Sequence, residues 1–218
     1  MRNPYKEPYR VADLAIAAMT KKGIRRLNEC KRKCISMKFD ELNVLGYIEE
    51  LYKGLDEDSQ EAFRAVWLAR FREVYWWYRK RKPDEDELDE LLDMEMAGLL
   101  RAPNPVVKYA YEPEVLRKRD RCGEAVAAVP DSSAKQDELD KHLKYFEKMA
   151  SWFVDFSADD ANLKAIEEAG GQYVVWNTQN DSKVCEDCKA LNGLVFPIHR
   201  VPDKPHPGCR CYLTMVRN

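Results

Sequence analysis

The stretch Cys185–Cys211, CEDCKALNGLVFPIHRVPDKPHPGCRC, decides how the C-terminal part of this chain folds. Cys185 and Cys188 stand in a C-x2-C spacing, and after seventeen further residues come His206, Cys209 and Cys211 in an H-x2-C-x-C spacing. Thiolate and imidazole groups suit zinc, which prefers four ligands in a tetrahedron. The stretch therefore predicts a structural zinc site that holds a small C-terminal unit together.

Five candidate ligands compete for the four positions around such an ion. One arrangement uses Cys185, Cys188, His206 and either Cys209 or Cys211. An all-cysteine site with His206 beside it is the alternative. Side chains alternate along an extended segment, which places Cys209 and Cys211 on one face. The arginine between them, residue 210, is expected to offset the negative charge of the thiolates.

Redox and catalytic interpretations of the same residues are weaker. A C-x2-C pair can be redox-active, but thioredoxin-like pairs open a helix after a strand of a βαβ unit, and the sequence shows no such unit. A dyad of Cys209 and His206 has no orienting acid or oxyanion-stabilising group nearby. The chain has seven cysteines and no secretory signal at its N-terminus, which indicates a reducing compartment rather than a disulfide framework. The remaining candidates, expected to be structural or solvated, are Cys30, Cys34, Cys122, His142 and His199.

Three short segments around the cysteines favour β-structure. They are residues 172–177 (QYVVWN), 194–196 and 212–216. Glycines and prolines between them indicate a small antiparallel sheet that buries little apolar surface, and units of this size usually need a metal or a cross-link. We predict a zinc-stabilised α+β domain over residues 171–218.

The preceding residues, 1–170, predict a helical body. Apolar residues recur at helical spacing in 21–38, 40–55, 59–80, 88–99 and 112–126. The prolines of the RAPNP segment predict a break over residues 101–105. The fold class is therefore mainly α, with a small C-terminal α+β tail.

Helix ends are also marked in the last part of the body. Ser133 and Gln136 have the spacing of a capping box and predict a helix start. Ser157 with Asp160 predicts a further N-terminus, and Gly170-Gly171 predicts the end of that helix.

Charge is unevenly distributed along the 218 residues, although the net charge is only −2. Residues 1–40 carry eleven Lys and Arg against four Asp and Glu, and residues 84–95 carry eight acids and no base. This asymmetry indicates either oriented contacts with a partner or two solvated helix faces. No apolar run is long enough to span a bilayer, so we expect no membrane partner.

The basic N-terminal stretch is a candidate for non-specific contact with DNA phosphates or with an acidic protein surface. Its members are Lys21, Lys22, Arg25, Arg26, Lys31, Arg32, Lys33 and Lys38. A second group, in which Trp76 and Trp77 precede four basic residues, suggests stacking on bases, but a helix end covering the core is the commoner explanation. A pI near 6.0 does not indicate a dedicated nucleic-acid binder.

The segment VWNTQNDSKVCEDCKALNGLVFPIHRVPDKPHPGCRCYL resembles the phage Mu F-like family of minor head, or head-morphogenesis, proteins. The resemblance covers roughly residues 160–215, about a quarter of the chain. The residues that carry it are Trp176, Asp181, Cys185, Cys188, Asn192-Gly193, Val195-Phe196 and the ending Pro205-His206-Pro207-Gly208-Cys209-Arg210-Cys211.

The resemblance implies a virion or prophage protein made in the bacterial cytoplasm, which binds the portal or the major capsid protein and helps to assemble heads or handles packaged DNA. It implies a structural protein rather than an enzyme. The chain ends seven residues after Cys211, so no fused C-terminal enzyme is expected. The alternatives are a metal-dependent enzyme acting on nucleic acid and a zinc-ribbon adaptor that binds nucleic acid.

Overall fold

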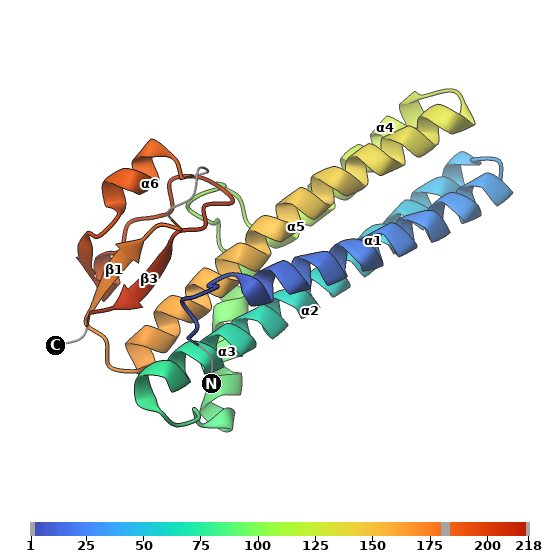
Figure 1. Cartoon of the computed structure of the whole chain (residues 1–218). Helices are drawn as coiled ribbons and strands as arrows, with labels where there is room; N and C mark the ends of the chain where they lie inside the picture. Colours follow the sequence, from blue (N-terminus) through green and yellow to red (C-terminus); the bar gives the residue numbers. More distant parts are fainter. Residues whose placement is uncertain (1–2, 180–183, 217–218) are drawn as a thin grey trace.

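The computed structural model describes residues 3–179 and 184–216 (Figure 1). Long helices lie side by side in a bundle, and a small sheet covers one end of it (Figure 1). In the described residues the helices are α1 (Arg10–Ser36), α2 (Glu41–Arg79), α3 (Glu85–Arg101), α4 (Tyr111–Ala128), α5 (Ser132–Glu168) and the short α6 (Glu186–Leu191). The strands are β1 (Tyr173–Asn177), β2 (Val195–Pro197) and β3 (Tyr212–Met215). The predicted class, a mainly helical body with a short antiparallel sheet, is confirmed.

The bundle core is built along α2 and α5. Phe63 of α2 meets Tyr111 edge to face at 4.9 Å between ring centroids, and Tyr111 meets Phe153 of α5 at 5.1 Å. All three rings are fully buried. Burial of such side chains contributes roughly 1.5–3 kcal/mol each, so this aromatic seam fixes α5 against α2. α5 in turn carries the face on which the tail lies.

Several predicted boundaries are confirmed. The helix predicted over 88–99 is part of α3, which begins after Asp84, and the Asp84 side chain accepts hydrogen bonds from the backbone N–H groups of Asp86 and Glu87. The acids of its first turn lie at the positive end of the helix dipole. The predicted break at 101–105 separates α3 from α4. α5 ends at Glu168, and Gly170 follows with φ +90°, a conformation that favours glycine.

One predicted helix start is correct within two residues but has a different cap, and a second predicted start is wrong. The N-cap of α5 is Asp131, which accepts from the N–H of Ala134 at 2.8 Å, so Ser133 and Gln136 form no capping box. Ser157 lies in the middle of α5 and is buried. Its hydroxyl donates to the carbonyl of Phe63 at 2.7 Å. A serine with a partner on another helix does not compete for its own backbone, so the helix continues.

The segments 40–55 and 59–80 also form one helix, α2, rather than two. Ser59 lies between them, and its hydroxyl donates to the carbonyl of Leu55 at 2.7 Å within the helix. The polar residues around it therefore mark a turn of a continuous helix and not a loop.

The sheet has the strand order β2-β1-β3, and both pairings are antiparallel. Val174 of β1 lies opposite Phe196 of β2 and Met215 of β3. Val174 is buried in the large hydrophobic core of the bundle, whereas Trp176 belongs to a second cluster with Cys188, Cys209 and Cys211. Val174 and Trp176 lie two residues apart on the same, buried face of β1, which thus joins the bundle to the cysteine loops.

The tail packs closely on the helices. Asn162 of α5 donates through Nδ2 to the carbonyl of Leu213 at 2.9 Å, and Tyr78 of α2 accepts from the N–H of Met215 at 2.9 Å. The division into a body (1–170) and a tail (171–218) stays a prediction. Within the described residues, no helix combines the length and the apolar character needed to cross a membrane.

Candidate metal centre

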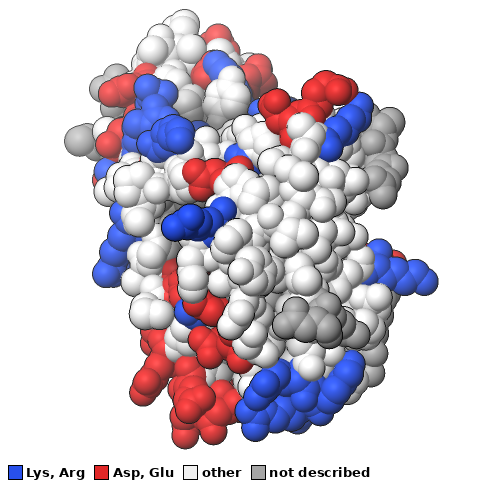
Figure 2. Space-filling view, turned by 90° about the vertical axis from the view of Figure 1, so that its left-hand side faces the viewer, with Lys and Arg blue, Asp and Glu red and all other residues white. Residues whose placement is uncertain are grey.

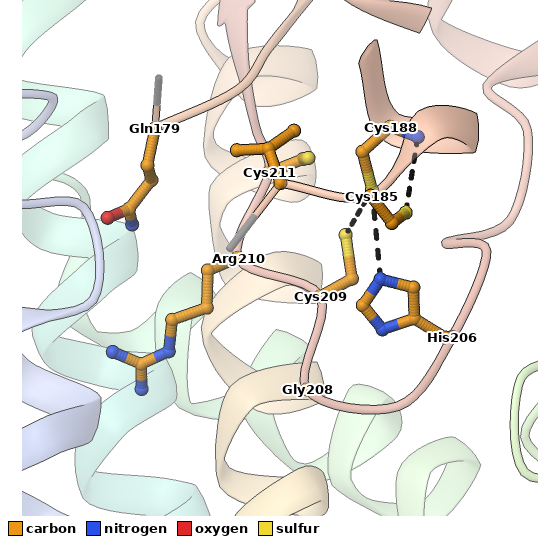
Figure 3. A pocket seen from close by; sticks show the side chains of 9 residues that line it. Gln179, Cys185, Cys188, His206, Gly208, Cys209, Arg210 and Cys211 are labelled. Carbon is orange, nitrogen blue, oxygen red and sulfur yellow. Dashed lines mark hydrogen bonds between the residues drawn. The ribbon is translucent and has the colours of Figure 1, made fainter. Parts of the chain in front are cut away.

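The five predicted ligands converge at one end of the small sheet (Figure 3). Cys185 is the N-cap of α6, and Cys188 lies in the first turn of that helix. His206, Cys209 and Cys211 come from the loop that leads into β3. Asp181, one of the residues of the family resemblance, lies outside the described residues. The chain thus brings together two segments that are far apart in sequence.

The C-x2-C pair owes its geometry to the start of α6. The backbone N–H of Cys188 donates to Sγ of Cys185 at 3.4 Å, as the first turn of a helix allows an N-cap side chain to accept (Figure 3). α6 was not predicted from the sequence. It turns both sulfurs to the same side.

Two overlapping trios of ligand atoms define the site. Cys185, Cys188 and His206 form one, and Cys188, Cys209 and Cys211 form the other, with the ligand atoms of each trio within 4.8 Å of one another. Sγ of Cys188 lies 3.4 Å from Sγ of Cys209 and 3.9 Å from Nε2 of His206. A tetrahedral ion with bonds of about 2.3 Å to sulfur separates its ligand atoms by roughly 3.8 Å. The cluster could therefore hold a metal ion.

His206 presents the nitrogen that such a site needs. Nδ1 lies 3.1 Å from the carbonyl oxygen of Pro207, and Nε2 faces the cysteines (Figure 3). A hydrogen bond from Nδ1–H to a carbonyl leaves the lone pair on Nε2, the arrangement commonly found for metal-bound histidine. The same carbonyl is the main cause of a raised pKa of His206, followed by interaction with Cys185.

The thiols differ in acidity. Burial raises the pKa of Cys188 to about 12, and the pKa of Cys209 is also raised, first by its hydrogen bond with Cys211 and then by burial. The pKa of Cys185 is lowered, chiefly because its sulfur accepts from the N–H of Cys188. That of Cys211 is lowered, chiefly by its hydrogen bond with Cys209. A bound cation would deprotonate these thiols, so its binding would release protons.

A cavity of about 350 Å³ opens beside the sulfurs, and the five candidates line it together with Gln179, Val184 and Arg210. Arg210 was expected to offset the negative charge of the thiolates, but it pairs with acids of the bundle instead. Its guanidinium bonds to Asp13 at 2.7 Å and to Asp155 at 3.2 Å, so it joins the loop to α1 and α5, and its side chain extends away from the cysteines in Figure 3.

A buried polar network, missed in the sequence, fastens this loop to the bundle. The hydroxyl of Tyr9 donates to the carbonyl of Cys211 at 2.7 Å and also contacts Asp159 of α5. Lys204 donates to the carbonyl of Cys209 at 3.0 Å and pairs with Asp159 and Tyr9. No local pattern points to these three residues, because their partners are far away in the chain.

The other sequence candidates lie outside the cluster. Cys30, Cys34 and Cys122 are buried inside the bundle, as expected for structural thiols. His142 lies 3.7 Å from Glu138 on the same helix, and the largely exposed His199 lies 3.9 Å from Glu167. Among the described residues, neither histidine belongs to a group of metal-ligating side chains.

Comparison with known proteins adds no assignment. The chain matches no protein-family model, no curated protein and no solved structure. The function is therefore inferred from the site itself and from the sequence motif around it.

Proposed function

We propose that the cluster binds one structural zinc ion through Cys185, Cys188, His206 and Cys209. The observation that carries this proposal is the gathering of three sulfurs and one imidazole around Sγ of Cys188, which lies 3.4 Å from Sγ of Cys209 and 3.9 Å from Nε2 of His206. Sulfur and imidazole donors favour zinc over the hard cations, which prefer oxygen. Cys211 remains beside the ion as the alternative fourth ligand.

The same ligand set supports a structural rather than a catalytic role. A catalytic zinc ion keeps one position open for water or substrate, whereas a structural ion has four protein ligands. Here the protein offers five donors for four positions. A closed site of this kind would tie α6 to the loop before β3 and so stabilise a sheet that has only three short strands.

We further propose that the chain is a minor head protein of a phage or prophage, which binds the portal or the major capsid protein and is carried in the virion. Support comes from the motif shared with the Mu F-like family. Its residues build the metal unit: Trp176 is buried beside the cysteines, and Gly193 donates to the carbonyl of Trp176 at 2.8 Å with φ +81°. Asn192 accepts from the N–H of Thr178 at 2.9 Å.

Particle composition tests the head-assembly proposal. We expect the chain in purified proheads or mature particles, and we expect it to co-purify with the portal oligomer when both are expressed together. If proheads and mature particles both lack the chain, the proposed role in the head is wrong. The zinc proposal is independent of that outcome and has its own test.

A further inference from the structure

Four consecutive cations lie at the end of α2: Arg79, Lys80, Arg81 and Lys82, here called the α2-end cluster. All four side chains are exposed. Within the part of the chain that the structure describes, none of them has a carboxylate within 4.0 Å, although Arg81 contacts the hydroxyl of Tyr75 at 3.5 Å. Figure 2 shows a dense group of Lys and Arg side chains at the lower end of the molecule, the end at which α2 terminates in Figure 1.

The basic N-terminal stretch is different, because four of its eight cations form ion pairs with acids of α2 and α5. Its ion pairs are Lys22 with Glu61, Arg26 with Asp58, Lys31 with Asp140 and Lys33 with Glu50, at 2.5 to 2.8 Å. The four exposed cations that remain are Lys21, Arg25, Arg32 and Lys38. They are spread over about 25 Å of α1 and its end, at a rise of about 1.5 Å per residue. Their charge density is therefore far lower than that of the α2-end cluster.

A groove of about 560 Å³ begins at the α2-end cluster and runs towards the sheet. Arg79 and Lys80 lie at one side, Gly170 and Tyr173 lie at the other, and no carboxylate lines it. Tyr173 is 49% exposed, so a flat ring faces solvent there. At Gly170 no atom lies within 4 Å of the position that a Cβ would occupy, which leaves the backbone open to a ligand. The nearby acids Asp84 and Glu87 line a different pocket, together with Glu168.

Lys80 is held in place at the mouth of this groove. Its ammonium lies 4.8 Å from the ring centroid of Trp76 and 4.5 Å from that of Trp77, which is the range of cation–π attraction. The left-handed backbone at Lys80 (φ 56°) ends α2 and directs the following cations away from the helix. The Lys80 side chain is thus partly ordered in the free protein, which reduces the conformational entropy lost when a ligand binds.

We propose that the α2-end cluster and this groove bind the phosphodiester backbone of a nucleic acid without base-sequence preference. Four adjacent unpaired cations match the closely spaced charges of such a chain. The exposed ring of Tyr173 offers a stacking surface for a base, which an acidic peptide would not use. The proposal does not depend on the metal centre, which lies at the cysteine end of the tail.

Binding of a fluorescent 20-nucleotide single strand and of the matching duplex to the full chain, as purified under reducing conditions, tests this proposal. If four phosphates are contacted, the dissociation constant should rise about 50-fold for the duplex and about 20-fold for the single strand between roughly 50 and 150 mM salt. The stronger binder of the two identifies which form the groove prefers. Failure of both to bind at the lower salt concentration would overturn the proposal.

The key variant replaces Arg79, Lys80, Arg81 and Lys82 by glutamine, and the matched control replaces Lys21, Arg25, Arg32 and Lys38 by glutamine. Both lose four exposed positive charges. We expect the cluster variant to lose at least tenfold in affinity and most of its salt dependence, and the control to stay within about threefold of the original chain. An equal loss in both variants would show that only net charge matters and would refute the assignment.

A second variant covers the case in which the end of α2 does not tolerate substitution. Arg81→Gln with Lys82→Gln lies outside the helix and should reduce the salt dependence for the duplex from about 50-fold to about 7-fold. An unchanged salt dependence would contradict the proposal. Competition by poly-glutamate as effective as that by the oligonucleotide would also contradict it, because the site would then be one for an acidic polypeptide.

Discussion

At the scale of single residues, Cys188 is the centre of the metal cluster. It belongs to both trios of ligand atoms, and its sulfur is within 4 Å of both Cys209 and His206. The spacing of the cysteines in the sequence was sufficient to predict the five candidates. It was not sufficient to choose among them, since the choice depends on the direction of the His206 ring and on the turn of α6.

Substitution of single ligands tests the proposed set. We expect Cys211→Ser to retain about one zinc ion per chain, and His206→Ala to lose at least tenfold in zinc affinity, because Nε2 of His206 already faces the sulfurs. Metal content and chelator competition measure both. Loss of zinc from Cys211→Ser together with retention in His206→Ala would establish the all-cysteine site instead.

Asp160 of α5 provides a test of burial and pH. Burial raises the pKa of its carboxyl to about 6, while the indole N–H of Trp67 donates to it at 2.6 Å. Because this pKa is higher in the folded than in the unfolded chain, the carboxyl opposes folding at neutral pH. That opposition disappears as the pH falls from about 6 towards 4.

We therefore expect Asp160→Asn to stabilise the protein at pH 7 by roughly 1–3 kcal/mol, and by progressively less at lower pH. Asparagine still offers an acceptor to Trp67. Urea unfolding at several pH values measures the effect, with Asp137→Asn on the exposed face of α5 as the control. A variant that is less stable than the original chain at pH 7 would show that the charge of Asp160 is favourable.

At the scale of elements, local sequence patterns predicted those ends of helices and strands that are determined by neighbouring residues. The acidic start of α3, the glycine turn after α5 and the three strands all follow from neighbouring residues. The capping pattern failed at Ser157, because its hydroxyl donates to the carbonyl of Phe63 on α2, 94 residues earlier in the chain. It also failed for α6, a helix of six residues, which is too short to show a periodic pattern.

The N-terminal segment before α1 is the element that could not be foreseen. Tyr5 stacks on Tyr212 at 5.9 Å between centroids, and the carbonyl of Pro4 accepts from Arg70 at 2.8 Å. Tyr9 reaches Cys211, 202 residues away. Hydrogen bonds between residues so far apart leave no periodic signal in the sequence. They make the first residues part of the seam between bundle and tail.

Tyr9→Phe should weaken this seam. The change removes a buried hydroxyl that bonds to the carbonyl of Cys211 and to Asp159, so we expect a loss of about 1–3 kcal/mol in the free energy of unfolding. Tyr145→Phe, at a half-exposed ring on α5, serves as the control. Equal stability of the two variants, measured by urea unfolding at constant zinc, would mean that the network of Tyr9 does not hold the tail.

At the scale of the whole molecule, the uneven charge of the sequence has a partly internal explanation. Four cations of the basic N-terminal stretch pair with acids of α2 and α5, so half of that charge already has a partner within the bundle. The exposed cations at the end of α2 have no such partners within the described residues. Composition alone could not separate these two cases, because it does not say which charges meet.

A large helical core and a small cysteine cluster are joined by β1, and in this arrangement a metal ion bound by the cysteines would stabilise the tail without holding the bundle together. Val174 extends the large core, and Trp176, two residues further along the same face of β1, belongs to the cysteine cluster. Loss of the metal is therefore expected to loosen α6 and the loop before β3, while α2 and α5 keep their packing.

Zinc content combined with hydrogen exchange tests the central claim most directly. Protein purified under reducing conditions should carry about one zinc ion per chain. Removal of the ion by a chelator should increase exchange in residues 184–211 and lower the thermal midpoint, with α2 and α5 still protected, and added zinc should reverse both changes. Freshly purified, reduced protein that contains no zinc, or a tail that exchanges equally with and without the ion, would contradict the account.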